Sequence, residues 1–311
     1  MTETAGHETV LKESAVAALN IRTQGAYVDA TFGRGGHSKA ILDQLGDQGS
    51  LLVLDRDPDA ITVANLMAEG DSRMTVSHCD FSQLGKATRE WNNEGVVDGI
   101  LFDLGVSSPQ LDNAERGFSF MRSGPLDMRM NPMQGISAAE WLNTAPENEI
   151  AEILFRLGEE KHARRMARAI VAQRALAEIS STGQLAEIVK QANPAWERDK
   201  HPATRAFQAI RIHINDEIAQ LESALEQALQ LLKPGGRLVV ISFHSLEDRI
   251  VKKFMAKQTK GDSFPRHLPV TADLLKPRLK TIGKKIRADA VEVSLNPRAR
   301  SAVMRVAEKL Q

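Results

Sequence analysis

Residues suited to binding a nucleoside cofactor lie near the start of the chain. Residues 29–37 read Asp-Ala-Thr-Phe-Gly-Arg-Gly-Gly-His, and an acidic residue ends the next apolar run. Glycines in a turn let the backbone approach a ligand closely, and a carboxylate after the second strand accepts hydrogen bonds from ribose hydroxyls. The residues expected to bind an adenosine-containing cofactor are Gly33, Gly35, Gly36 and Asp55.

The spacing of the glycines distinguishes between the classes of cofactor that such a turn could bind. A dinucleotide fingerprint needs Gly-x-Gly-x-x-Gly, but His37 and Ser38 follow Gly36 and the third glycine is absent. The Gly-Lys-Ser/Thr ending of a P-loop is also absent from this stretch. A compact turn suits a ligand without a pyrophosphate, such as S-adenosylmethionine. The alternative is a tight strand-to-helix turn without a ligand, with His37 as a cap or surface residue.

Two later segments fit the same kind of site. Phe81 follows a strand-like run at 74–78, where an aromatic ring could stack on adenine or simply pack in the core. Ligands of open α/β sheets bind beyond the carboxyl ends of the strands. Polar residues at the end of the run 97–104 are therefore expected where cofactor and substrate meet: Asp103, Ser107, Ser108 and Gln110. A loop rich in turn-forming residues is the alternative for this segment.

A sheet must position these residues, and the hydrophobic pattern predicts one. Strand-like runs occupy residues 26–30, 50–55, 74–78 and 97–104. Helical patterns occupy residues 37–46, 58–69 and 81–92 between them. Strands that alternate with helices of this length favour an α/β fold with a mostly parallel sheet.

A block of helical patterns then interrupts the alternation. Helices are expected from Ser137 and over residues 146–157, 159–179 and 182–192. The α/β pattern returns with a helix at 216–232, ended by Lys-Pro-Gly-Gly, a strand at 237–243, a helix at 247–256 and a strand at 301–307. We predict one α/β domain from residues 1–113 and 216–311, with an inserted helical domain at 114–215.

Longer motifs make the chain similar to a known family. They occupy residues 7–14, 29–37, 103–111, 115–121, 124–130, 201–211, 242–251 and 296–301. These segments closely resemble the bacterial small-subunit ribosomal RNA cytosine-N4 methyltransferases, the RsmH or MraW family, nearly from end to end. The resemblance implies a class I, Rossmann-like, S-adenosylmethionine-dependent methyltransferase whose inserted helical domain recognises RNA. It also implies N4-methylation of one 16S rRNA cytidine near the P site of the small ribosomal subunit.

The family's cofactor-contacting residues transfer position by position. They fall on Gly35, Gly36, His37, Asp55, Phe81, Asp103 and Gln110. The cytosine N4 amine is a poor nucleophile, so an enzyme must hold it in line with the sulfonium methyl and offer it hydrogen-bond acceptors. The candidates for this catalytic role are Asp103, Ser107 and Ser108.

The aromatic residue of the acceptor loop is missing from this chain. Other amino-methylating enzymes carry Asp/Asn/Ser-Pro-Pro-aromatic there, which residues 107–110 match only in part. Phe118 and Phe120 could supply the stacking face or belong to the core. Methylation at cytosine C5 would need a cysteine nucleophile, and Cys79 is expected on the adenine side of the site.

Positive charge is concentrated locally, although 40 basic residues balance 40 acidic ones. One predicted helix face carries Lys161, Arg164, Arg165 and Arg168, and the region after Arg249 is rich in Lys and Arg. Such patches bind phosphate without a basic protein overall; the alternative is a solvated helix face. Arg205 and Arg211, in the segment 201–211, could contact RNA or pack the inserted domain against the core. His244 and Glu247 are further candidates for substrate contact.

Composition sets the remaining expectations. One cysteine excludes an intramolecular disulfide and a cysteine-based metal cluster, and we expect no metal. Without a signal-peptide pattern or an apolar run of about 18 residues, we expect no membrane association and a cytoplasmic location. Two other functions stay open: a small-molecule methyltransferase, and a ribosome-assembly factor with a vestigial cofactor site.

Overall fold

The computed structural model describes residues 9–193, 201–262 and 275–311. His7 and Glu8 of the first family motif, and Pro194 after the predicted helix 182–192, lie outside the described residues. The chain divides into two compact units: unit 1 is Met1–Gly105 with Ala219–Gln311, and unit 2 is Val106–Ile218. The boundaries expected from the sequence were 113/114 and 215/216. The structure puts the first boundary earlier, after Gly105, and the second later, after Ile218.

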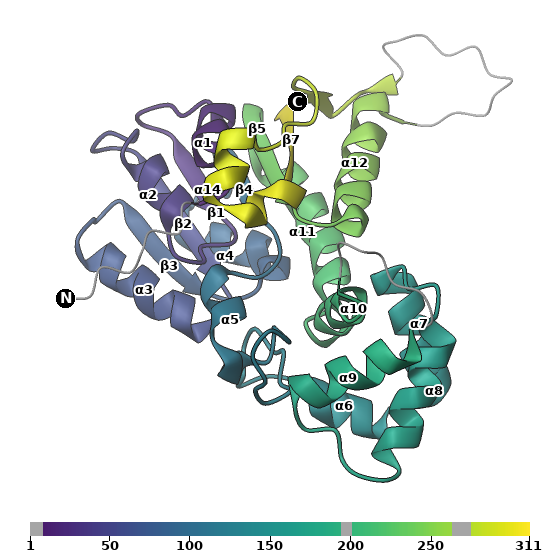
Figure 1. The fold of residues 1–311 in the computed structure, drawn as a ribbon. Helices are drawn as coiled ribbons and strands as arrows, with labels where there is room; N and C mark the ends of the chain where they lie inside the picture. Colours follow the sequence, from purple (N-terminus) through teal and green to yellow (C-terminus); the bar gives the residue numbers. More distant parts are fainter. Residues whose placement is uncertain (1–8, 194–200, 263–274) are drawn as a thin grey trace, which may run out of the picture. The chain divides into compact units, whose positions relative to one another are not determined.

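Unit 1 is built on a seven-stranded sheet with the order β3-β2-β1-β4-β5-β7-β6 (Figure 1). The strands are β1 (Ala26–Asp29), β2 (Ser50–Asp55), β3 (Met74–His78), β4 (Val97–Asp103), β5 (Leu232–Ser242), β6 (Leu279–Thr281) and β7 (Val303–Lys309). The first five strands run parallel, and β7 is antiparallel to β5 and β6. This arrangement confirms the predicted α/β fold with a mostly parallel sheet.

Strand β5 begins five residues earlier than expected, at Leu232 instead of Arg237. Lys-Pro-Gly-Gly was expected to separate a helix from a strand, but these residues belong to β5 itself. Val97 pairs with Leu232 and Gly99 with Arg237, so an irregularity in the pairing with β4 absorbs the extra residues. The short edge strand β6 had no recognisable sequence signal, because three residues are too few to show alternation.

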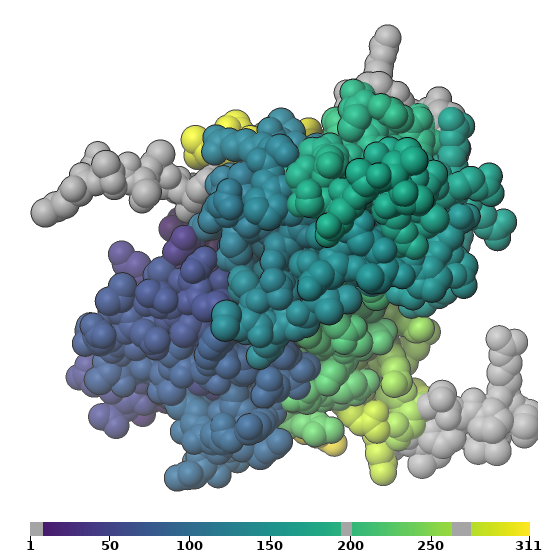
Figure 2. Space-filling view, turned by 90° about the horizontal axis from the view of Figure 1, so that it is seen from below, coloured from purple at the N-terminus to yellow at the C-terminus, as the bar shows by residue number. Residues whose placement is uncertain are grey.

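Helices cover both faces of the sheet in unit 1. They are α1 (Lys12–Leu19), α2 (Gly36–Leu42), α3 (Pro58–Glu69), α4 (Leu84–Trp91), α11 (Glu217–Leu231), α12 (Ser245–Lys260) and α14 (Ala290–Leu295). Side chains of α4, α11 and α12 share a core with Ile100 and Phe102 of β4. Side chains of α1, α2 and α3 share another core with Leu101, the β4 residue between these two. Alternate residues of β4 thus point to opposite cores. Figure 2 shows the purple-to-blue and green-to-yellow parts of unit 1 packed side by side.

Unit 2 is mainly helical in its described residues. Its helices are α5 (Ser108–Asp112), α6 (Ala138–Thr144), α7 (Glu147–Gly158), α8 (Ala163–Arg174), α9 (Thr182–Ala192) and α10 (Thr204–Ile214). Ser137 and Ser181 begin α6 and α9 with capping boxes, as the Ser-x-x-Glu/Gln spacing predicts. The predicted helix 159–179 is shortened to α8, because Glu159 takes a left-handed conformation (φ 51°) and ends α7.

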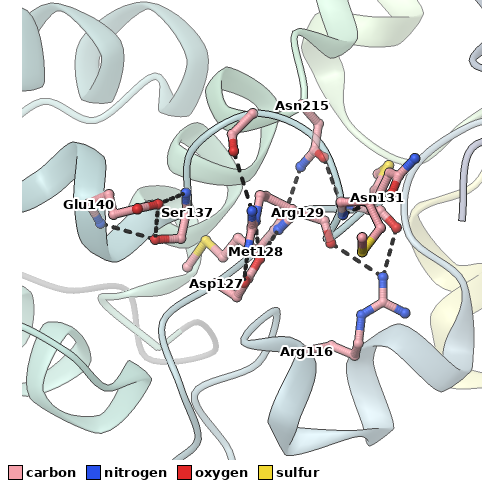
Figure 3. A network of polar contacts seen from close by, with 11 residues as sticks. Arg116, Asp127, Met128, Arg129, Asn131, Ser137, Glu140 and Asn215 are labelled. Carbon is pink, nitrogen blue, oxygen red and sulfur yellow. Dashed lines mark hydrogen bonds and ion pairs between the residues drawn. The ribbon is translucent and has the colours of Figure 1, made fainter.

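A polar network orders the long loop before α6 (Figure 3). Arg129 Nε and Nη2 donate to the Asp127 carboxylate at 2.9 and 2.6 Å. The Arg116 guanidinium donates to the carbonyl of Met130 at 2.8 Å. Met128 between them is buried and has a φ of 63°. Residues other than glycine rarely adopt this left-handed backbone conformation. The surrounding hydrogen bonds therefore hold an unfavourable backbone geometry in place.

Asn215 connects this loop to the end of α10. Its amide donates to the Met128 carbonyl and accepts from the Met130 N–H, both at 2.8 Å. Asn215→Ala should leave both buried backbone groups without a partner, which costs about 2–4 kcal/mol in unfolding free energy. Urea denaturation of the variant and of Asn93→Ala, a substitution in an exposed turn of unit 1, would measure this. A midpoint for Asn215→Ala equal to the wild-type value would show that the network does not stabilise the loop.

Candidate functional site

The glycine turn between β1 and α2 requires each of its glycines for a different reason. Gly33 and Gly35 have φ values of 57° and 77°. A Cβ on Gly35 would lie 2.7 Å from the Phe32 ring, and one on Gly36 would lie 1.7 Å from Thr9 Oγ1. A Cβ on Gly33 would meet no heavy atom within 4 Å. The backbone at Gly33 thus borders open space, as expected for a turn that receives a ligand.

Asp55 is joined directly to this turn. Its carboxylate accepts the Gly33 N–H at 2.8 Å and the Asp57 N–H at 2.9 Å. A carboxylate has about four acceptor sites, so these two bonds orient Asp55 and leave capacity for ribose hydroxyls. Burial raises the pKa of the Asp55 carboxyl. The structure therefore brings together the glycine turn and the acidic residue that the sequence paired with it.

Asp103 lies at the end of β4, the strand next to β1. Its backbone N–H donates to Thr31 Oγ1 at 2.6 Å, and its Oδ2 is 3.6 Å from Nδ1 of the buried His37. The other carboxyl oxygen, Oδ1, is buried and has no hydrogen-bond partner. Burial, with smaller contributions from Asp29 and Glu247, raises the pKa of Asp103 well above its usual range. Asp103 thus presents an unsatisfied acceptor beside the glycine turn.

Asp29 and His37 are neighbours of Asp103, and burial shifts the pKa of each. Ser38 Oγ donates to Asp29 Oδ2 at 2.6 Å, and burial raises the pKa of Asp29 to about 6. Burial lowers the pKa of His37 to about 4, so its imidazole is neutral at pH 7. Asp29 had no predicted role of its own. A signal was present, because β1, β2 and β4 each end in an aspartate: Asp29, Asp55 and Asp103.

Phe81 and Cys79 follow β3, and β2 and β1 lie between β3 and β4 in the sheet. The Phe81 ring packs edge-on against Phe102, with ring centroids 6.0 Å apart. Phe81 is only partly buried, so part of its ring surface remains exposed beside the core. Burial raises the pKa of the Cys79 thiol, which disfavours the nucleophilic thiolate. A role for Cys79 as nucleophile near Asp103 is therefore disfavoured by both chemistry and position.

Ser107, Ser108 and Gln110 belong to unit 2, at the start of α5. Ser107 is the N-cap of this helix, and its N–H donates to the Gln110 side-chain oxygen at 2.9 Å. Gln110 is buried, whereas both serines are partly exposed. Gln110 thus shapes the turn. The serine side chains stay partly accessible four and five residues after Asp103.

The two phenylalanines of unit 2 have packing partners. Phe118 is 6% exposed, with the Arg116 guanidinium 5.8 Å from its ring centre. Phe120 stacks on His201 at a centroid distance of 4.5 Å and meets Phe207 edge-on at 5.0 Å. Phe118 therefore matches the alternative of a core residue. Phe120 remains partly exposed.

The arginines that are candidates for RNA contact differ in their exposure and in their ion pairs within the protein. Arg164 and Arg168 are exposed on α8, and Arg168 lies 3.9 Å from Glu147. Arg211 is held by a bidentate pair with Glu217, at 2.8 and 2.9 Å. Arg205 on α10 is partly buried. The exposed face of α8 is thus the more accessible of these basic surfaces.

His244 has a structural role at the start of α12. Its Nδ1 accepts the Glu247 N–H at 3.4 Å, so it acts as the N-cap, and its side chain is 9% exposed. Such a residue presents little surface to a substrate. The spacing His-x-x-Glu resembles a capping box with histidine in place of serine. That similarity is the signal by which this role could have been recognised.

The described residues contain neither a group of three or more His, Cys, Asp or Glu arranged to hold a metal nor a helix long and apolar enough to cross a membrane. The polar groups at the ends of β1, β2 and β4 are instead suited to an organic ligand. They combine one accessible backbone turn, one oriented carboxylate and one unsatisfied carboxyl oxygen.

Comparison with protein families gives a match over nearly the whole chain. A family model described as the MraW methylase family matches residues 4–310. Among solved structures, an rRNA methylase from Streptococcus thermophilus is similar at 11% identity and a TM-score of 0.42, covering 99% of both chains. A SAM-dependent O-methyltransferase from Thermotoga maritima gives 11% and 0.42, covering 99% of this chain and 69% of the other. The structural matches are distant, so the family match is the informative one.

Proposed function

Because the chain belongs to the MraW methylase family, we propose that it transfers the methyl group of S-adenosylmethionine to the N4 amine of one cytidine in 16S rRNA. The nucleotide lies near the P site of the small ribosomal subunit. The observation that supports this most is the unpartnered Asp103 carboxyl oxygen beside the open glycine turn and Asp55. An acceptor in that position is what a weakly nucleophilic amine requires.

The residues at the strand ends fit an adenosyl donor. Asp55 would hold the ribose hydroxyls, the backbone at Gly33 would admit the ligand, and Phe81 would offer its free ring surface to adenine. Neutral His37 lies beside Asp103 and would face the same ligand. When bound, S-adenosylmethionine supplies an electrophilic methyl group on a cationic sulfur. The site itself supplies position and charge.

Asp103 accepts the proton that the amine loses. A bond forms between the methyl carbon and N4, the carbon–sulfur bond breaks, and one N4 proton passes to the Asp103 carboxylate. A carboxyl whose pKa is raised by burial is a stronger base when ionised than an ordinary aspartate. Ser107 and Ser108, which follow in the chain, orient the amine through their hydroxyl oxygens. Gln110 shapes the turn that carries them.

Incorporation of labelled methyl groups tests this function. Purified protein is incubated with tritium-labelled S-adenosylmethionine and either naked 16S rRNA or small subunits from a strain that lacks the modification. We expect label in at least one substrate. Binding of the donor without any labelled RNA would overturn the enzymatic proposal and favour a ribosome-assembly factor, whereas label in small molecules alone would favour a small-molecule methyltransferase.

The exposed basic face of α8 is proposed to bind rRNA phosphates. Arg164 and Arg165 are exposed there, while Ala163, Met166 and Ala167 are buried on the opposite side. Replacing both arginines by alanine should weaken RNA binding and reduce the slope of log Kd against log salt by about 0.7 for each phosphate that is no longer neutralised. Filter binding from 50 to about 300 mM salt measures this. An unchanged slope would show that this face of α8 does not contact RNA phosphates. Arg156→Ala, at an exposed position on α7, is the matched control.

A further inference from the structure

Leu11, at the start of α1, has a backbone conformation that its own side chain does not favour. Its φ and ψ are 53° and 28°, in the left-handed region that bulky residues rarely adopt. Helices usually begin with a Ser, Thr, Asp or Asn whose side chain accepts a backbone N–H, but Leu11 has no such group. Its side chain is buried. A conformation of this kind persists only where surrounding contacts hold it in place.

A carboxylate from the other end of the chain supplies one of these contacts. Oε1 of Glu292, on α14, accepts the Leu11 N–H at 2.6 Å, although the two residues are 281 positions apart. In Figure 1, yellow α14 accordingly lies beside purple α1. The backbone N–H of Glu292 donates in turn to the side chain of Asp289, the N-cap of α14, at 2.8 Å. The acceptor of the Leu11 N–H is therefore carried on an ordered helix.

Core packing does not account for α14. None of its six residues is buried, and Val291 and Leu295 are 67% and 71% exposed. Val293 packs against a core cluster of unit 1 but stays partly exposed. A helix of this length is not stable by itself in water. The hydrogen bond from Leu11 to Glu292 thus gives α14 a role that burial of apolar surface does not.

Residues 9–11, which this bond holds, border the glycine turn. Thr9 fills the space beside Gly36, because a Cβ on Gly36 would lie 1.7 Å from Thr9 Oγ1. The Val10 carbonyl accepts a hydrogen bond from the His37 ring, and both of these residues are buried. A shift of residues 9–11 would therefore release the start of α2 and the imidazole together.

We propose that Glu292 is a positioning residue for the methyl donor. It acts through residues 9–11, which its hydrogen bond holds against Gly36 and His37. This rests on the proposed function, because it takes the glycine turn as the donor site. Loss of the bond leaves the Leu11 N–H without this acceptor and the left-handed turn with less support. Residues 9–11 then leave the glycine turn more often, and the donor meets a site that is formed only part of the time.

Three variants of Glu292 separate the reach of the side chain from its charge. Glu292→Ala removes the acceptor, and Glu292→Asp keeps the charge but is shorter by one methylene group. Glu292→Gln keeps the length and a side-chain oxygen but is uncharged. We expect the Kd for S-adenosylhomocysteine, measured by calorimetry, to rise about tenfold in the Ala and Asp variants, equivalent to about 1.4 kcal/mol, and much less in the Gln variant. Ser294→Ala is the matched control, because the Ser294 hydroxyl donates within α14, to the Val291 carbonyl at 2.7 Å.

Steady-state kinetics distinguish positioning from general damage to the fold. Glu292→Ala should raise the KM for S-adenosylmethionine about tenfold, while kcat at saturating donor and the KM for RNA stay unchanged, because excess donor draws the protein into its binding-competent form. General damage would instead lower kcat through a smaller amount of active enzyme. Glu292→Gln should restore the KM for the donor.

Amide hydrogen exchange tests the contact without any ligand. We expect the Leu11 N–H, followed by NMR in the unliganded protein, to exchange more than about tenfold faster in Glu292→Ala than in wild type. In Glu292→Gln, whose side-chain oxygen still accepts this N–H, we expect the exchange rate to stay close to the wild-type value.

Three outcomes decide between the proposals. Unchanged exchange at Leu11 in Glu292→Ala overturns the inference, whether or not the protein binds the donor. Faster exchange with unchanged donor affinity overturns it as well, while methyl transfer to rRNA would still support the proposed function. Failure of the wild-type protein to bind either nucleoside contradicts the proposed function and, with it, the role of Glu292 in donor binding; the exchange rates then still show whether Glu292 holds residues 9–11.

Discussion

Asp103→Ala is expected to lower kcat for methyl transfer by about 10²- to 10⁴-fold, the usual contribution of a positioned proton acceptor. The variant removes the only unpartnered carboxyl oxygen among the described groups at the ends of β1, β2 and β4. Asp103→Asn should be similarly impaired, because an amide cannot take the amine proton. Asp47→Ala, in the exposed loop before β2, is the matched control. Full activity of Asp103→Ala would remove Asp103 from the mechanism.

The stability of the Asp103→Asn variant separates catalysis from folding. The folded protein raises the pKa of Asp103 above its value in the unfolded chain, so the fold binds this proton more tightly. Stability therefore falls as pH rises from the unfolded value of 3.8 through the raised folded pKa. Above that window, Asp103→Asn should be at least as stable as wild type. A lower Tm at pH 8 would indicate that the loss of activity reflects damage to the fold.

Gly36→Ala is expected to abolish donor binding, with a Kd raised by more than about 100-fold, which corresponds to the few kcal/mol of a severe steric clash. The added Cβ would lie 1.7 Å from Thr9 Oγ1 and 2.9 Å from Thr9 Cβ, so the start of α2 must move away from the turn that Asp55 holds. Calorimetric titration with S-adenosylhomocysteine measures the loss.

Two companion variants make the Gly36 prediction specific. Thr9→Gly removes the atoms that the new methyl group meets, so the double variant should recover much of the affinity. Gly70→Ala adds the same methyl group at a helix end where the nearest neighbour would be a backbone oxygen at 3.5 Å, and it should bind normally. Wild-type affinity in Gly36→Ala would show that Thr9 and α2 yield easily and that the turn is not a rigid cradle.

The parts of the fold and site that repeat a local pattern could be predicted from the sequence. The first four strands have strand-like sequences, and the parallel sheet follows from their alternation with helices. Asp55 and Asp103 could be named because ligands bind at the carboxyl ends of such strands. The contact of Asp55 with the Gly33 N–H agrees with that reasoning.

Other features depend on contacts that no local pattern reveals. Arg211 looked available to RNA, but the left-handed residue Asp216 turns the chain so that Glu217 pairs with it. Phe118 follows a glycine in a polar stretch, yet its ring is buried. Glu247 looked like a residue close to the substrate, and only the pairing of β4 with β5 shows that it lies beside Asp103. In each case a partner distant in sequence or a single backbone angle determines the environment.

Nucleoside analysis of the methylated RNA tests the central claim most directly. After incubation with deuterated methyl donor, 16S rRNA from small subunits lacking the modification is digested to nucleosides and analysed by mass spectrometry against standards. We predict labelled N4-methylcytidine at one position, absent with Asp103→Ala and present with Asp47→Ala. Label in 5-methylcytidine or in a 2′-O-methyl nucleoside, or no labelled nucleoside despite donor binding, would contradict methyl transfer to the cytosine amine.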